Sequence, residues 1–275
     1  MPPGAVAEPI WNPAWRGDLL AGIRRIGAEA LERWQRHDFS VELKGRIDPV
    51  TEVDRWVEQT LRELLLGLCP AASFIGEESW QGETPGNGWV VDPIDGTVNF
   101  AAGLPQFALS VAWLEQGRSV FGCVFAPALG EFFWAEEGAG SYLNGTRLKV
   151  SDVRELVNAV GASGFPYWVR EQPRERNNLA AWEFLLVRVR ALRRGGCASL
   201  DLAYTAAGRF GFFWEPGLKL WDVAAGRLLV EEAGGVVSRY DGTPFTDGFV
   251  PILAAAPQMH KELVHLLTPF DHDQP

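Results

Sequence analysis

Histidine and cysteine are scarce in this sequence. Its four histidines lie near the two ends of the chain, which argues against a histidine-based zinc site and against a Ser-His-Asp triad. The three cysteines, Cys69, Cys123 and Cys197, are odd in number and widely spaced. Because they offer neither a disulfide framework nor a metal-binding spacing, we expect the chain to work in a reducing compartment.

Long apolar runs and an excess of basic charge are also lacking. No run approaches the roughly 18 apolar residues of a membrane-spanning helix, and residues 1–13 have neither the basic nor the apolar region of a signal peptide. Acidic residues number 35 against 25 basic ones, which gives a formal net charge of -10. That charge argues against nonspecific binding to nucleic acid or to an anionic membrane. We therefore expect a soluble, cytoplasmic protein with neither kind of partner.

The composition is that of a globular protein. Of the 275 residues, 47% are hydrophobic and 22% are charged, which fits one large domain or two small, tightly packed ones. We predict an N-terminal arm over residues 1–15, an α+β half over 16–150 and an α/β half over 151–275. The twelve tryptophans lie mostly at core-facing positions without basic neighbours, so they predict core packing rather than platforms for stacking bases.

The spacing of apolar residues predicts the order of helices and strands. Helical spacing over 17–35 and again after Thr51 predicts two amphipathic helices. Expected strands of the first half cover 41–44, 72–75, 89–91, 107–114, 120–125, 131–135 and 141–150, the last four as an antiparallel meander. In the second half, strands over 159–162, 210–214, 236–240 and 252–254 alternate with helices over 174–194, 199–209, 223–233 and from Pro257 onward.

One stretch joins strand, turn and acid signals. The apolar strand Trp89–Val91 stops at Asp92, and Pro93 predicts a turn because proline cannot continue the strand ladder. A second carboxylate, Asp95, is followed by a glycine and then by Thr97, whose hydroxyl lies near backbone N–H groups. Two acids beside such donors suit a divalent cation together with a phosphate. The alternative is an ordinary Asp-Pro turn followed by an Asp-Gly turn.

Further acids stand at the ends of predicted elements. Glu77 follows a strand, as Asp92 does, and Asp222 precedes a helix. Oxygen ligands without histidine or cysteine suit a hard cation, above all Mg²⁺. Each acid also has a plainer interpretation: Glu77 as part of a solvated loop and Asp222 as a helix N-cap. Likewise Thr51 with Asp54 fits a capping box at the start of the second helix.

The sequence resembles the inositol monophosphatase family. Three stretches are similar to its signature motifs, namely Gly76–Ser79 (GEES), Trp89–Phe100 (WVVDPIDGTVNF) and Leu220–Gly226 (LWDVAAG). Further matches are Lys44, Asp48–Thr51, Asp54, Gly164–Pro166 and Gly196–Tyr204. The similarity extends from about Asp18 to Leu267. It implies a layered α-β-α-β-α sandwich of the sugar-phosphatase type, with α+β and α/β halves, and a homodimer.

The resemblance also implies a role for each site residue. Two to three Mg²⁺ ions, with Mn²⁺ as a possible substitute, would be bound by Glu77, Asp92, the Ile94 carbonyl, Asp95 and Asp222. Catalytic residues that hold the attacking water and its protons would be Glu77, Thr97, Asp54 and Thr51. Substrate would contact Asp95, Gly96, Thr97, Ala198, Glu215 and Asp222. By this resemblance 16–150 is the metal-binding half and 151–275 the substrate-side half.

The implied activity is that of a Mg²⁺-dependent phosphomonoester hydrolase, with metal-activated water attacking phosphorus in line. The expected substrate is a small phosphorylated metabolite, inositol 1-phosphate first and histidinol phosphate second. The family also acts on fructose 1,6-bisphosphate, 3′-phosphoadenosine 5′-phosphate and NADP, and it is lithium-sensitive.

Two features leave the substrate open. Cys197 stands where family members usually carry a threonine or serine, and Glu215 fits a turn acid before Pro216 as well as a substrate contact. An alternative of another class is a non-catalytic regulatory binding protein. The complete set of metal acids with Thr97 argues against it, and the negative charge argues against RNA as its partner.

Overall fold

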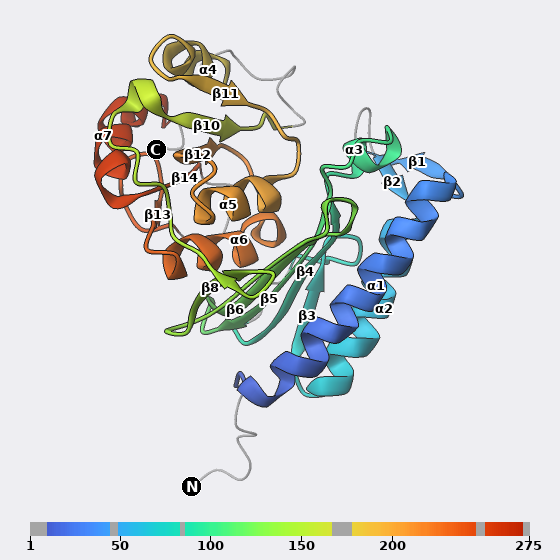
Figure 1. Cartoon of the computed structure of the whole chain (residues 1–275). Coiled ribbons are helices and arrows are strands. Elements are labelled where there is room, and N and C mark those ends of the chain that lie inside the picture. The colour runs from blue at the N-terminus through green and yellow to red at the C-terminus, as the bar shows by residue number, and fades with distance from the viewer. Residues whose placement is uncertain (1–9, 45–48, 83–85, 167–177, 246–250, 272–275) are drawn as a thin grey trace, which may run out of the picture.

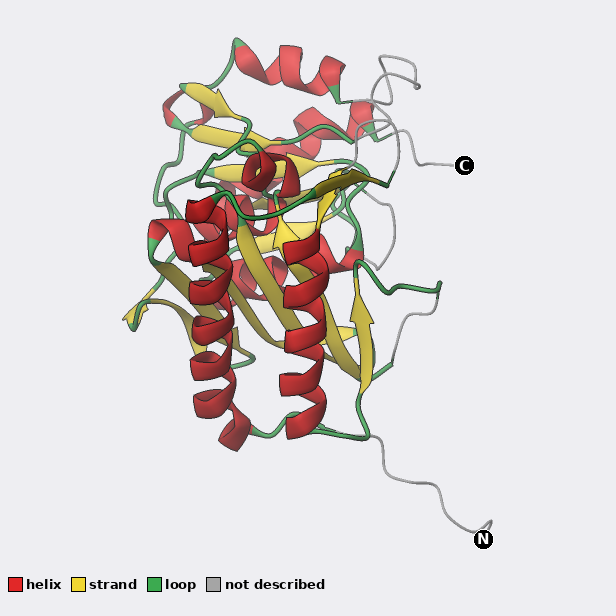
Figure 2. Ribbon diagram, turned by 90° about the vertical axis from the view of Figure 1, so that its right-hand side faces the viewer, coloured by secondary structure: helices red, strands yellow, loops and turns green. Residues whose placement is uncertain are grey.

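The computed structural model describes residues 10–44, 49–82, 86–166, 178–245 and 251–271. Two long helices, α1 (Arg16–Arg36) and α2 (Glu52–Leu68), lie side by side across one face of a large sheet (Figures 1 and 2). Each helix buries its apolar stripe against that sheet, as their helical spacing predicts. In the chain segment that connects these helices, β1 (Val41–Leu43) and β2 (Pro49–Thr51) form an antiparallel ribbon.

The large sheet has seven strands in the order in which they occur along the chain. Its strands are β3 (Ser73–Gly76), β4 (Gly88–Asp95), β5 (Ala108–Glu115), β6 (Arg118–Ala126), β7 (Glu131–Glu136), β8 (Gly140–Leu143) and β9 (Thr146–Arg147). Only β3 and β4 pair in parallel; the remaining pairs are antiparallel. The predicted meander is confirmed for β5 to β7, but the single strand expected over 141–150 was wrong, because the chain turns at Asn144-Gly145 and forms the hairpin of β8 and β9.

Strand β4 corrects one prediction. We expected the chain to leave the strand at Pro93, but β4 continues to Asp95. The register shifts between Asp92, which pairs with Ser110, and Asp95, which pairs with Ala108. Pro93 and Ile94 of β4 thus face the single residue Leu109 of β5, so this is a bulge, the kind of place where a strand accommodates proline. The short helix α3 (Thr97–Ala101) follows at once.

The second sheet has five strands in the order β11-β10-β12-β14-β13. They are β10 (Val160–Ser163), β11 (Ala191–Arg193), β12 (Phe212–Glu215), β13 (Val236–Ser238) and β14 (Ile252–Ala255). The accompanying helices are α4 (Leu179–Leu186), α5 (Ala198–Ala206), α6 (Leu220–Glu232) and α7 (Pro257–Leu267). Single turns of 3-10 helix cover Pro13–Trp15, Pro127–Leu129, Leu156–Asn158 and Thr268–Phe270.

The helix predicted over 174–194 was too long. Its first four residues lie outside the described residues, α4 ends at Leu186, and residues 191–193 form strand β11 beside β10. From Val187 to Arg193 apolar and basic residues mostly alternate, and an alternating pattern is typical of a strand.

The layers follow the order α1/α2, large sheet, α5/α6, small sheet, α4/α7 (Figure 1). Three apolar cores fill the spaces between successive layers. The middle core joins the large sheet to α5, α6 and the small sheet, so it draws residues from both sides of position 150. The predicted α-β-α-β-α sandwich is confirmed. Within the described residues, no helix has the length and apolarity to cross a membrane.

Candidate active site

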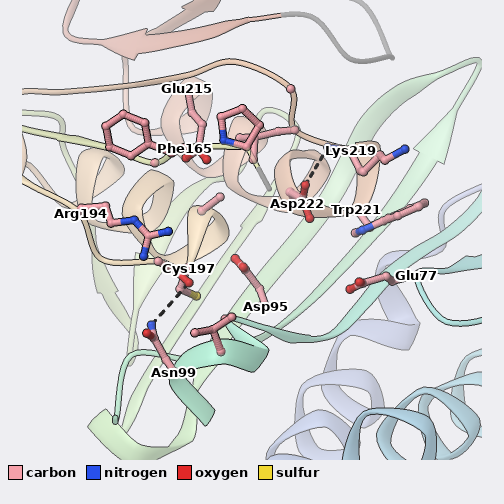
Figure 3. Close-up of a pocket in the computed structure, with 18 of the residues that line it drawn as sticks. Glu77, Asp95, Asn99, Phe165, Arg194, Cys197, Glu215, Lys219, Trp221 and Asp222 are labelled. Carbon is pink, nitrogen blue, oxygen red and sulfur yellow. Dashed lines mark hydrogen bonds between the residues drawn. The ribbon is translucent and has the colours of Figure 1, made fainter. Parts of the chain in front are cut away.

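A cavity of about 430 Å³ opens where the two sheets approach each other. Its wall includes the predicted residues Glu77, Asp95, Gly96, Ala198, Glu215 and Asp222. Figure 3 shows Glu77, Asp95 and Asp222 facing the same space from three different elements. Glu77 follows β3, Asp95 ends β4 and Asp222 lies in the first turn of α6. The fold therefore brings together acids that are far apart in the sequence.

The parallel pairing of β3 with β4 explains why two of these acids lie at one edge of the sheet. Gly76 is opposite Val91, and the Glu77 N–H donates to the Val91 carbonyl at 3.1 Å. Strand β3 therefore ends beside Val91, in the middle of β4, and Glu77 follows next to Asp92 of the neighbouring strand. The start of α6 is held to the same edge because the Ser110 hydroxyl, opposite Asp92, donates to the Trp221 carbonyl at 3.2 Å.

Asp92 lies beneath the cavity and is 2% exposed. Its Oδ1 has no hydrogen-bond partner among the described residues. Burial, followed by the nearby carboxylates of Glu77 and Asp95, raises its pKa well above the usual value. An unpaired buried carboxylate beside other acids is unfavourable without a cation. Oxygen donors of this kind fit a hard divalent ion such as Mg²⁺.

Other acids around the cavity also have raised pKa values. Burial and neighbouring carboxylates raise the pKa of Asp222 and Glu215 well above their usual values. Burial also raises the pKa of Asp95, although the Ser199 N–H donates to its Oδ2 at 2.6 Å and lowers it in part. Negative charge is thus concentrated at the point where both sheets meet.

Lys44 partly balances these acids. Its ammonium lies 3.0 Å from Glu77 Oε1 and also contacts Glu78. Although burial opposes it, the pair of carboxylates raises the Lys44 pKa. Within the described residues, no three acidic, histidine or cysteine side chains stand as a preassembled group of metal ligands. The donor set has the right chemistry for such an ion, and Lys44 contacts one of the two carboxylate oxygens of Glu77, Oε1.

Thr51, Asp54 and Thr97 form a buried hydrogen-bonded chain behind the acids. Asp54 Oδ2 accepts from the Thr51 N–H at 2.9 Å and from its hydroxyl, which confirms the predicted capping box. Asp54 Oδ1 lies 2.9 Å from the Thr97 hydroxyl, which is also 3.0 Å from the Ile94 carbonyl oxygen. Burial raises the pKa of Asp54. The capping residues therefore also connect to the predicted site.

The N-cap interpretation of Asp222 was wrong. Helix α6 begins three residues earlier than expected, so Lys219 is the N-cap and Asp222 is the third helical residue. Asp222 Oδ2 accepts from the Lys219 N–H at 2.7 Å, as the acid of a capping box does. This places the carboxylate at the inner side of the helix start.

A sequence profile described as the Inositol monophosphatase family matches residues 19–270. The chain belongs to the inositol monophosphatase family. The resemblance found in its motifs is thereby confirmed.

Members of this family with different names are similar to the chain. It is 45% identical over 240 residues to the Nus factor SuhB of Pseudomonas aeruginosa, covering 86% of this chain and 87% of that protein. It is 44% identical over 200 residues to the inositol-1-monophosphatase of Rhizobium meliloti, covering 72% and 74% respectively. Among solved structures, the IMPase of Thermotoga maritima has a TM-score of 0.83 at 34% identity, covering 93% of this chain and 97% of that one.

Glu215 and Cys197 lie across the cavity from Glu77 (Figure 3). Glu215 is the last residue of β12, is buried and lines the cavity with Ala198 (Figure 3). Cys197 lines it too, and burial followed by the Asp95 charge raises the pKa of its thiol, which favours the neutral form. The cavity thus brings Ala198, Cys197 and Glu215 together with Glu77 and Asp95 of the large sheet.

Several cavity residues had no predicted role. Asn99 ties α3 to the loop before α5, because its Nδ2 donates to the Gln106 carbonyl at 2.6 Å and to the Gly195 carbonyl at 2.8 Å. Arg194, Trp80 and Lys219 also line the cavity. Asn99 lies within one of the motifs quoted above and Trp80 directly follows another, so the sequence could have indicated both. Arg194 and Lys219 only flank motifs, and the sequence did not single them out.

Proposed function

We propose that this chain is a Mg²⁺-dependent phosphomonoester hydrolase whose first candidate substrate is inositol 1-phosphate. The observation that carries the proposal is Asp92, a buried carboxylate with an unpartnered oxygen among the described residues, close to a cavity lined by four further acids. Similarity to a Rhizobium meliloti protein named inositol-1-monophosphatase supports the choice of substrate.

In this proposal, two to three ions would be held by Glu77, Asp92, Asp95, Asp222 and the Ile94 carbonyl, with Mn²⁺ as a substitute for Mg²⁺. When bound, such ions neutralise phosphate charge and lower the pKa of a coordinated water. The protein's own contribution is to fix these oxygens at one edge of the large sheet and at the start of α6. Lys44 would move from Glu77 when that carboxylate takes up its ligand role.

The hydrogen-bonded side chains of Thr51, Asp54 and Thr97 would take up the proton of the attacking water. The Thr97 hydroxyl is held by Asp54 Oδ1 at 2.9 Å, so its oxygen is oriented to accept a hydrogen bond from water. Asp54, whose pKa is raised by burial, is suited to take up a proton at Oδ1. Thr51 fixes the other oxygen of the carboxylate.

The alcohol of the ester would lie against Glu215 and Ala198, with the phosphate at Gly96 and Thr97. Histidinol phosphate is the second candidate, and the bisphosphate, nucleotide and NADP esters acted on elsewhere in the family follow. The proposal also includes a cytoplasmic location, a homodimer and inhibition by lithium. The location rests on the lack of disulfides among the three cysteines, and the other two rest on the family.

A regulatory binding role is the second candidate. It is favoured by the 45% identity to a Pseudomonas aeruginosa protein named Nus factor SuhB. The two roles are compatible, but the binding role alone would leave the acids around Asp92 without a use. We therefore place hydrolysis first.

The test is phosphate release from inositol 1-phosphate, histidinol phosphate, fructose 1,6-bisphosphate, 3′-phosphoadenosine 5′-phosphate and NADP. Each ester is assayed with Mg²⁺ and with EDTA. We expect Mg²⁺ to raise the rate on at least one ester by roughly a hundredfold or more, since metal stabilisation of the transition state is worth several kcal/mol. Absence of turnover on every ester would overturn the proposal and favour the binding role.

A further inference from the structure

Trp80 is an exception among the tryptophans. Unlike the fully buried Trp89, Trp113 and Trp214, it is 43% exposed, and it lines the cavity three residues after Glu77. Its ring meets the ring of Trp221 edge to face, with centroids 5.6 Å apart. Our expectation of core packing without basic neighbours was therefore wrong for this residue.

Lys219 completes an aromatic corner, by which we mean Trp80, Trp221 and Lys219. Its ammonium lies 5.2 Å from the centroid of the Trp80 ring and 5.9 Å from that of Trp221. Such cation–π contacts hold the exposed indole against the start of α6. The indole of Trp80 is thereby given a defined position at the cavity wall, although much of its surface remains uncovered.

The opposite wall of the cavity carries polar side chains as well as Phe165. Figure 3 shows Arg194, Glu215 and Asn99 on the side away from Trp221 and Lys219. Arg194 and Glu215 carry side-chain donors and acceptors that suit hydroxyl groups. One side of the cavity thus carries Trp80 and Trp221, and the other side carries hydrogen-bonding groups beside Phe165, with the acids Asp95 and Asp222 between them.

A cyclic polyol matches this division. Its hydroxyl groups project from the rim of the ring, while its C–H bonds leave two weakly apolar faces, and an indole packs well against such a face. An acyclic polyol has no continuous face to offer and loses more rotational freedom when it is bound.

We propose that Trp80 is a specificity-determining residue that packs against the C–H face of a cyclic polyol phosphate, with the ring hydroxyls directed towards Arg194 and Glu215. This inference rests on the proposed phosphatase function and names the substrate class of the same site. Lys219 acts through Trp80 as a positioning residue.

The first experiment compares inositol 1-phosphate with acyclic glycerol 2-phosphate in the wild type, Trp80→Ala and Trp80→Phe. We expect Trp80→Ala to raise KM for the cyclic ester by about 3- to 10-fold with kcat nearly unchanged, which is the range an aromatic contact produces. Trp80→Phe should restore most of the affinity, and KM for glycerol 2-phosphate should stay the same in all three proteins. Equal changes on both esters, or none on the cyclic one, would overturn the inference.

Saturation-transfer NMR separates this inference from the proposed function. Inositol 1-phosphate is mixed with wild-type protein or with Trp80→Ala, and transfer from the protein to the ring C–H protons is measured. We expect strong transfer in the wild type and weaker transfer in the variant, whether or not the ester is hydrolysed. Turnover without any effect of Trp80 on transfer or KM would remove the inference and leave the phosphatase proposal standing.

Discussion

At the scale of residues, the site is defined by its acidic side chains and by the groups that contact them. The acid types and their positions at strand ends predict oxygen ligation, and the structure gathers Glu77, Asp95 and Asp222 around one cavity. Local spacing also predicts the capping box of Thr51 with Asp54. The contact of Lys44 with Glu77 was not predictable, because the two residues are 33 positions apart. Such long-range contacts depend on the packing of whole elements.

His260 gives a prediction for pH. It is buried on α7, and its Nε2 lies 2.7 Å from the Ser238 hydroxyl. Burial lowers its pKa below the usual 6.5, so the unfolded chain takes up the proton first as pH falls. The stability that neutral His260 contributes is therefore complete above the unfolded pKa and declines as pH falls from there towards the folded pKa.

We expect the melting temperature of the wild type minus that of His260→Gln to decrease as the pH is lowered from about 7.5 to 5. A decline of about 2–4 °C corresponds to 1 kcal/mol in a domain of comparable size. The measurement is thermal unfolding of both proteins across this range in EDTA. Because the variant retains every other titrating group, the difference isolates His260, and a constant or rising difference would contradict the assignment.

At the scale of elements, periodic patterns predict more than boundaries do. The helical spacing of α1 and α2 and the apolar runs of β5 to β7 predict their type and approximate extent. The predicted boundaries of elements were wrong where another feature of the structure compensated for a local sequence signal. The Pro93 segment stays in β4 because a bulge absorbs it, and Asp222 is inside α6 because Lys219 takes the N-cap position.

The close approach of α6 to the large sheet depends on small residues. Gly122 of β6 lies between Ala112 of β5 and Ala135 of β7 in the sheet register. A Cβ at Gly122 would lie 2.9 Å from the Cα of Ala225 and 3.0 Å from its carbonyl oxygen. Since both are backbone atoms, the helix that carries Asp222 would have to move.

We expect Gly122→Ala to destabilise the protein by about 1–3 kcal/mol, as overpacking of a well-packed contact does. Gly67→Ala is the matched control because a Cβ there meets nothing within 4 Å. Gly67 lies in the last turn of α2, so alanine should leave the stability unchanged or raise it by up to about 1 kcal/mol. Denaturant unfolding measures both variants, and equal stabilities would show that α6 does not require the small residue.

At the scale of the whole molecule, an acidic chain gathers several acids around one cavity. The net charge of -10 is compatible with an anionic substrate only if positive charge is supplied locally. The site needs both sheets, because Glu77 and Asp95 come from one and Glu215 ends a strand of the other. Composition and periodicity predict the two halves. Which residues of each half come together at the site was predictable only from the family motifs. The boundary near residue 150 stays a prediction.

The most direct test is the effect of Mg²⁺ on thermal unfolding of the wild type, Asp92→Asn and Asp152→Asn. Asp152 is the matched control because it is exposed and pairs with Lys149 on the surface. If the acids hold Mg²⁺, the ion should stabilise the wild type and Asp152→Asn by about 2.7 kcal/mol at 100 times the dissociation constant. Asp92→Asn should fold, lose most of this stabilisation and lose phosphate release. A Mg²⁺ effect equal in all three proteins, or absent from the wild type, would contradict the assignment of the metal site.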